Sequence, residues 1–230
     1  MAAEPGTRLV LVRHGESNVT VNRVIGGHRS CSGLSDLGRQ QAERLAGRWV
    51  DNEEFAADVL VTSDFARAIE TGAIIMQSLG AAVSAVEPTE MAGFGEHDPG
   101  PDIDGMTFQA YIDEHGSPDW AGDPDTVIFP GGETMNEFHA RVHGAIDDLV
   151  AEHGAKTTVV ACHGGVIDAT FRRLLRLGVT GSVQLQALNT SITEIVSTES
   201  GTWRLERYND AAHLAGLPAR TERSAPRTDG

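Results

Sequence analysis

Three segments of the sequence each place a histidine, an arginine or both within a few residues of an apolar run. These side chains are Arg13, His14, Arg67 and His163. Arginine presents a planar fork of donors that matches phosphate oxygens, and it stays charged at any working pH. A histidine between two guanidinium groups is held neutral and is therefore nucleophilic near pH 7. These residue types predict attack by His14 on a phosphoryl group, with the two arginines and His163 holding its oxygens.

Hydrophobic patterns indicate the elements that must bring these side chains together. The apolar runs 9–12, 58–61 and 157–161 predict buried strands, and each precedes one of the three segments. Amphipathic patterns predict intervening helices at about 35–50, 64–76, 132–149 and 164–177. Alternating strands and helices favour a mostly parallel sheet covered on both faces, which binds ligands beyond the carboxyl ends of its strands. The three segments are therefore expected to meet at one edge of the sheet.

The remaining patterns predict peripheral elements. A weaker strand is expected at 81–86, and residues 191–198 and 202–208 predict a hairpin. The polar segment 218–230 is expected to be a disordered tail.

Composition limits the classes of partner. The chain has 230 residues, with 18 basic and 33 acidic side chains and a net charge of −15. This sign argues against nucleic acid or an anionic membrane as the main partner, because both attract clustered Lys and Arg. No apolar run is long enough to span a bilayer, and the N-terminus lacks the apolar stretch of a signal peptide. Two cysteines are too few for a disulfide framework. We therefore expect a cytoplasmic protein.

The charge is concentrated in one stretch. Residues 87–126 contain eleven acidic side chains and no Lys or Arg, so they carry −11 of the −15. The plain interpretation of such a stretch is a solvated excursion from the core.

Four motifs taken together resemble the histidine phosphatase superfamily, which includes the cofactor-dependent phosphoglycerate mutases and many phosphatases. They are residues 11–17 (LVRHGES), 34–38 (LSDLG) with Gln41 and Ala42, 63–71 (SDFARAIET) and 162–165 (CHGG). The resemblance covers residues 8–208. It implies an α/β fold, a three-layer α/β/α sandwich in a single domain over residues 1–217, with a lid inserted at 87–132. It implies no metal and no other cofactor.

The resemblance also implies roles for individual residues. His14 resembles the phosphorylated nucleophile, and Arg13, Arg67 and His163 resemble the phosphate pocket. Gly26 and Gly165 fall where the family contacts phosphate through the backbone. Many members have Asn six residues after the nucleophile, whereas this chain has Thr20, which keeps a hydroxyl group but loses the amide.

The general acid is a second departure from the family pattern. Members usually place a Glu four residues before a Gly, but counting back from Gly95 reaches Met91, one residue past Glu90. Protonation of the leaving oxygen needs an acid within hydrogen-bond reach. We expect Glu90 to be this acid if one inserted residue restores the spacing, with Glu96 as the alternative.

We expect a metal-independent phosphomonoester hydrolase that acts through a phosphohistidine on a small phosphorylated metabolite. A mutase interconverting 2- and 3-phosphoglycerate is the alternative, and a phospho-ligand-binding module is a third hypothesis. A mutase needs extra cations for a second phosphate, and the expected lid has none, so electrostatics favour hydrolysis. A homodimer is also expected, from the resemblance and from the unpaired edge of the hairpin.

Overall fold

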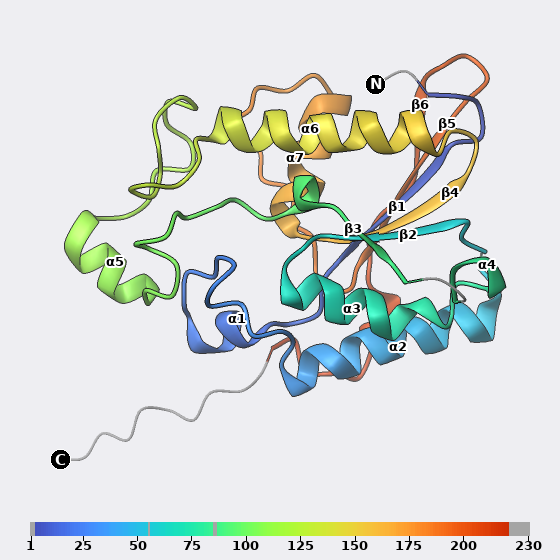
Figure 1. Cartoon of the computed structure of the whole chain (residues 1–230), viewed down its shortest axis with the longest axis horizontal. Coiled ribbons are helices and arrows are strands. Elements are labelled where there is room, and N and C mark those ends of the chain that lie inside the picture. The colour runs from blue at the N-terminus through green and yellow to red at the C-terminus, as the bar shows by residue number, and fades with distance from the viewer. Residues whose placement is uncertain (1–2, 55, 85–86, 221–230) are drawn as a thin grey trace.

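A six-stranded sheet forms the centre of the protein (Figure 1). This computed structural model describes residues 3–54, 56–84 and 87–220, so most of the expected tail, 221–230, lies outside the described residues. The strands are β1 (Arg8–Arg13), β2 (Val59–Thr62), β3 (Thr89–Glu90), β4 (Thr157–Cys162), β5 (Ile192–Ser197) and β6 (Trp203–Asp210). Their order is β3-β2-β4-β1-β5-β6. The first four are parallel, while β5 runs antiparallel to β1 and β6 antiparallel to β5.

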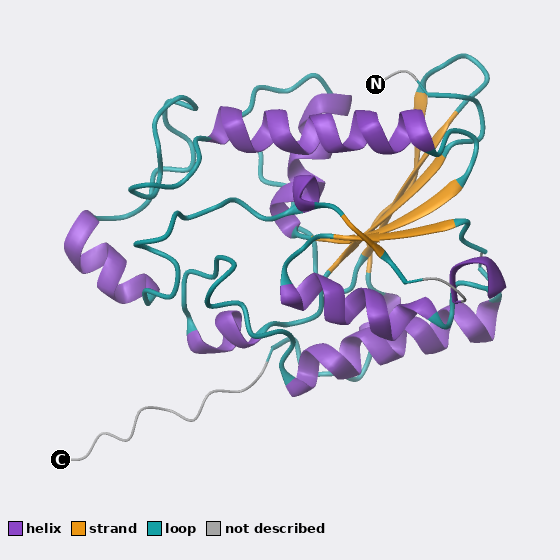
Figure 2. Ribbon diagram, viewed as in Figure 1, coloured by secondary structure: helices purple, strands orange, loops and turns teal. Residues whose placement is uncertain are grey.

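Helices cover both faces of this sheet and complete the expected three-layer α/β/α sandwich (Figure 2). One layer contains α2 (Asp36–Asn52) and α3 (Ala66–Met76), and the other contains α6 (Met135–Glu152) and α7 (Gly164–Leu174). The shorter helices are α1 (Asn18–Asn22), α4 (Ala81–Ser84) and α5 (Phe108–His115), with 3-10 turns η1 (Ala92–Phe94) and η2 (Ala212–Leu214). None of the described helices is both long and apolar enough to cross a membrane.

The side chains of β1 show why the sheet needs both layers. Leu9 and Leu11 are buried in the cluster formed with α6 and α7. Val10 and Val12 are buried in the cluster formed with α2 and α3. Successive side chains of a strand point to opposite faces, so an unbroken apolar run is stable only where both faces are covered.

Two local expectations differ from the structure. The segment expected as a strand at 81–86 contains the helix α4, and the edge strand β3 begins at Thr89. Val83 is buried with α2 and β2 from this helical turn, so tertiary packing outweighs its strand propensity. Helix α3 begins at Ala66 instead of directly after Ser63, whose hydroxyl accepts from the Phe65 N–H at 3.1 Å and lies 2.8 Å from His163 Nε2.

The segment expected as an insertion, 87–132, contributes β3 to the sheet, and its later part is anchored on the loop that follows β1, so it is more than the solvated excursion expected from its composition. Ile25 of that loop packs in a small buried cluster with Ile103, Tyr111 and Phe129 of the insertion. The Asp104 carboxylate accepts hydrogen bonds from the backbone of Gly27, at 2.9 Å, and of neighbouring residues. Burial alone would raise the pKa of Asp104, but these hydrogen bonds lower it overall.

Candidate active site

His14 lies in the loop just after β1, with its side chain buried. Its Nδ1 atom is 2.6 Å from the carbonyl oxygen of Gly15. A carbonyl oxygen only accepts hydrogen bonds, so Nδ1 must carry the proton and Nε2 must carry the free lone pair. The backbone therefore fixes the tautomer in which Nε2 is the nucleophilic atom.

Arg67 joins the two histidines. Its Nε atom is 3.2 Å from His14 Nε2 and 3.2 Å from His163 Nδ1. The second histidine is held from its other side, since His163 Nε2 is 2.8 Å from the hydroxyl oxygen of Ser63. The two imidazole rings meet edge to face with their centroids 5.1 Å apart. The ends of β1, β2 and β4 thus bring together the side chains that the sequence placed near three separate strands.

Both histidines are kept neutral. Burial, followed by the positive charge of Arg67 and then of Arg13, lowers the pKa of His14 well below its usual value. Burial and Arg67 are also the main causes that lower the pKa of His163. A neutral imidazole is the form that can attack phosphorus.

Arg13 completes the cationic site with a donor that has no partner. Its Nη1 atom donates to the backbone carbonyl of Ala187. Its Nε atom is buried and has no hydrogen-bond partner among the described residues. This guanidinium lies beside Gly164 in the first turn of α7, where helix N–H groups also favour an anion. An unsatisfied buried donor at a helix N-terminus fits a phosphate oxygen.

The two helices of the first layer hold the loop that carries His14. The backbone N–H of Gly15 donates to Thr71 of α3 at 3.1 Å. The backbone N–H of Glu16 donates to Gln41 of α2 at 2.8 Å. Ser35, which caps α2, donates its hydroxyl to the Glu16 carboxylate at 2.8 Å. The polar residues of motifs 34–42 and 63–71 therefore position the nucleophile through its neighbours.

The three expected substrate-binding residues occupy different places. Gly26 lines the adjoining pocket, and its carbonyl oxygen lies 3.5 Å from Nη1 of Arg67. Gly165 lines the same pocket, and its backbone N–H donates to Glu96 at 3.2 Å. Thr20 is exposed on α1, where its hydroxyl is 2.9 Å from that of Ser17, and it is not part of the pocket lining.

Of the two carboxylates considered for the proton donor, Glu96 lines the pocket and Glu90 does not. Glu90 is exposed at the end of β3, opposite Thr62 of β2, and does not line the pocket. The 3-10 turn η1 then carries the chain across to α7, so that Glu96 reaches the site. Glu96 lies close enough to Arg13 to stabilise its charge. Glu90, the expected acid, thus lies outside the pocket lining, whereas Glu96, the alternative, lies within it beyond the turn η1.

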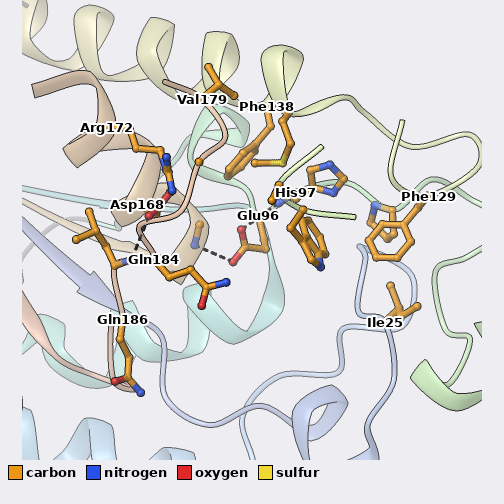
Figure 3. A pocket seen from close by; sticks show the side chains of 18 of the residues that line it. Ile25, Glu96, His97, Phe129, Phe138, Asp168, Arg172, Val179, Gln184 and Gln186 are labelled. Carbon is orange, nitrogen blue, oxygen red and sulfur yellow. Dashed lines mark hydrogen bonds and ion pairs between the residues drawn. The ribbon is translucent and has the colours of Figure 1, made fainter. Parts of the chain in front are cut away.

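The cluster of Arg13, His14, Arg67 and His163 forms the expected phosphate site. A cavity of about 870 Å³ adjoins it (Figure 3). Its aromatic lining comes from the insertion and the start of α6, namely Phe108, Trp120, Phe129 and Phe138. The opposite side is formed by α7 and the segment after it, including Asp168, Arg172, Gln184 and Gln186. Sequence reasoning missed this aromatic lining, because residues that converge from distant segments share no spacing along the chain.

The arrangement provides a nucleophile, an acid and donors for a phosphoryl group. Within the described part of the chain, no group of three or more His, Cys, Asp or Glu side chains is placed to hold a metal ion. A neutral histidine beside two guanidinium groups has the form needed of a nucleophile toward phosphorus.

Comparison with known proteins agrees with this geometry. A family model described as "Histidine phosphatase superfamily (branch 1)" matches residues 9–211. The chain is 29% identical over 209 residues to "Phosphoglycerate mutase-like protein 4" of Arabidopsis thaliana, which covers 90% of this chain and 86% of the relative. It is 26% identical over 214 residues to "Metal-independent phosphoserine phosphatase" of the same plant, which covers 92% and 84%. A mycobacterial glucosyl-3-phosphoglycerate phosphatase structure has a TM-score of 0.70 and 28% identity, covering 88% of this chain and 98% of that one. The chain therefore belongs to the histidine phosphatase superfamily and is an enzyme of the phosphatase type.

Proposed function

We propose that the protein hydrolyses phosphomonoesters through a phosphohistidine at His14, with no metal ion. The observation that carries this proposal is the fixed tautomer of His14, whose Nε2 lone pair faces Arg67 while Nδ1 is occupied by Gly15. The unpartnered Nε of Arg13 supplies a donor for the phosphoryl group beside it. A binding module would not need an oriented nucleophile.

In the first step, Nε2 of His14 forms a bond to phosphorus while the bond to the alcohol oxygen of the substrate breaks. The departing oxygen takes a proton from Glu96, which stands at the pocket side of the phosphate site. Charge on the equatorial oxygens is stabilised by Arg13, by Arg67 and by the first turn of α7.

In the second step, water attacks the phosphohistidine. The Glu96 carboxylate accepts the proton of that water, the bond between phosphorus and Nε2 breaks, and inorganic phosphate leaves. His14 regains its lone pair and Glu96 regains its proton, so all atoms and charges balance over the cycle.

The names of similar proteins support hydrolysis. One relative is named a metal-independent phosphoserine phosphatase, and one structural neighbour is a glucosyl-3-phosphoglycerate phosphatase. A mutase must hold a second anionic group while it transfers phosphate, and residues 87–126 carry no Lys or Arg to do so. Hydrolysis is therefore the better supported of the two reactions.

Phosphate release from simple phosphomonoesters in excess chelator tests the proposal. We expect the wild type to release phosphate, and His14→Ala to lose at least about 10⁴-fold in rate. His153→Ala, which changes a histidine at the far end of α6, is the matched control and should retain activity.

Three outcomes would contradict the proposal. Loss of release in chelator would indicate a metal-dependent hydrolase. Interconversion of 2- and 3-phosphoglycerate faster than phosphate release would indicate a mutase. Absence of both activities in the wild type would indicate a binding module.

A further inference from the structure

The cavity beside the phosphate site presents aromatic surface to solvent. Phe108 and Trp120 of the insertion are each 42% exposed, although both line this cavity. They continue the surface of Phe129 and Phe138, which are buried deeper. Contiguous exposed apolar surface inside a concave site is typical of a ligand-binding pocket and uncommon elsewhere on a protein surface.

A polar group lies within this aromatic surface. His97 is buried, with an exposed fraction of 7%. It meets the rings of Trp120, Phe129 and Phe138 edge to face, with centroids 5.4 to 5.9 Å apart. Neither of its nitrogens has good hydrogen-bond geometry to a described group, although the ring lies near the Glu133 backbone. A neutral imidazole in this position can exchange a hydrogen bond with a neutral ligand group.

The charges around the cavity disfavour a second anionic group on the substrate. Arg172 is the one Arg or Lys among the described residues that line it. Its Nε donates to Asp168 at 2.5 Å, its Nη1 donates to the carbonyl of Gly178 at 2.9 Å, and its Nη2 donates to the carbonyl of Val183. The guanidinium is thus paired with a carboxylate and three of its five N–H donors are used, while Glu96 adds a second carboxylate to the same space.

Arg141, a cation near the cavity, also pairs with groups of the protein itself. Arg141 of α6 pairs with Glu133 at 2.6 Å. It also donates to backbone carbonyls of the turn before Glu96, including Gly93 and Gly95, each at 3.1 Å. A carboxylate or second phosphate on the substrate would therefore meet the carboxylates of Asp168 and Glu96, beside guanidinium groups that are already paired.

Neutral hydrogen-bonding groups complete the cavity. Gln184 and Gln186 extend from the segment after α7, and Figure 3 shows Gln184 directed into the same space as Glu96. An amide offers both donors and an acceptor, and so suits hydroxyl, amide or ring-nitrogen groups. A volume of about 870 Å³ is also far more than a three-carbon acid fills.

We infer that the substrate is the phosphomonoester of an alcohol that carries an aromatic ring and neutral or positively charged polar groups, and no second anionic group. This inference rests on the proposed function, because it assigns the cavity to the leaving group. Phosphate binds between Arg13 and Arg67, and the aromatic ring binds among Phe108, Trp120 and His97.

Three esters of primary alcohols test the inference at similar leaving-group basicity: propyl phosphate, 3-phenylpropyl phosphate and 3-phosphoglycerate. In excess chelator, kcat/KM should be roughly 10- to 100-fold higher for the phenylpropyl ester than for the propyl ester, because the phenyl ring is buried. The kcat/KM for 3-phosphoglycerate should lie below that of propyl phosphate.

Variants of Phe108 and Trp120 test whether these residues cause the preference for the phenylpropyl ester. Phe108→Ala and Trp120→Ala should each reduce the ratio of phenylpropyl to propyl kcat/KM by roughly 3- to 10-fold. Ile112→Ala is the matched control, because Ile112 lies on the same helix as Phe108, is 39% exposed and does not line the cavity. It should leave the ratio unchanged.

Binding of phosphonates separates this inference from the proposed function. Calorimetry should show 3-phenylpropylphosphonate binding roughly 10-fold or more tightly than propylphosphonate, whether or not the enzyme turns over any ester. Equal affinities, or tighter binding of a carboxylated phosphonate, would overturn the inference about the substrate. Turnover of all esters without preference would overturn it as well, while leaving the hydrolase proposal intact.

Discussion

The phosphate site and the aromatic cavity next to it are built on different principles. In the phosphate site, Arg67 near the start of α3 is hydrogen-bonded to His14 and to His163, which follow the strands β1 and β4. The cavity is lined by Trp120 and Phe108 of the insertion, and both side chains are partly exposed. The first region is organised before substrate arrives, and the second presents apolar surface that a substrate would cover.

This difference assigns reaction and selectivity to separate parts of the chain. The sheet and its first-layer helices hold the nucleophile through local hydrogen bonds such as that from Gly15 to Thr71. The cavity side chains of Phe108 and Trp120 take no part in those hydrogen bonds, so their substitution should leave the bonds in place. Substitutions in the two regions should therefore have different kinetic signatures.

The largest effect is expected in the phosphate site. Arg67→Gln removes the donor shared by both histidines and a positive charge facing the transferred phosphoryl group, so kcat/KM should fall by roughly 10³- to 10⁵-fold for every ester. Steady-state phosphate release measures the change. Arg204→Gln, on the exposed strand β6, is the control. A loss confined to the aromatic ester would contradict this division of roles.

The carboxylate at the boundary of the two regions should have the next largest effect. Glu96→Gln should lower kcat for propyl phosphate by about 10²- to 10⁴-fold, because alkoxide leaves poorly without a proton. With p-nitrophenyl phosphate, whose leaving group needs no proton, the first step should be much less affected. Glu90→Gln is the matched control and should change neither rate. The opposite result would restore Glu90 as the acid.

A cation introduced into the cavity should change selectivity by a smaller amount. Gln184→Lys places an ammonium group opposite the aromatic residues, and should raise kcat/KM for 3-phosphoglycerate by roughly 2- to 5-fold relative to propyl phosphate. Competition between the two esters in one reaction measures the ratio. Gln184→Met, similar in length but uncharged, should give no gain. A gain with methionine would show that charge is not the cause.

The smallest of these effects is expected in the pH dependence of kcat/KM. The lowered pKa of His14 keeps the imidazole neutral as the pH falls below 6.5, so the acid limb of kcat/KM should lie below that pH after correction for protonation of the substrate. Arg67→Gln removes one cause of the lowered pKa, so its acid limb should move to higher pH. A limb that stays in place would mean that Arg67 does not set the protonation of His14.

The sequence predicted that His14, Arg67 and His163 come together, because the determinants of their positions are local. Arg13 and His14 follow a buried strand directly, and parallel strands deliver their carboxyl ends to one edge of a sheet. Ser35 and Gln41 lie in a motif whose spacing matches one helix start. Each step depends on a short segment and on general rules of topology.

The same reasoning failed where tertiary packing decides. Spacing favoured Glu90 over Glu96, whereas the turn η1 between them brings Glu96 to Gly165. Residues 81–84 form the helix α4, from which Val83 is buried, and residues 85–86 lie outside the described part of the chain. The aromatic cavity depends on contacts among segments far apart in the chain, which no periodicity records.

Trapping the phosphoenzyme tests the central claim most directly. Glu96→Gln should form the intermediate from p-nitrophenyl phosphate in excess chelator but hydrolyse it slowly, because the base that activates water is lost. After rapid quenching in alkali, we predict nearly one acid-labile phosphate per chain, located on His14 by mass spectrometry and absent from His14→Ala. Turnover without such a phosphoenzyme, or phosphate on another residue, would contradict a reaction through His14.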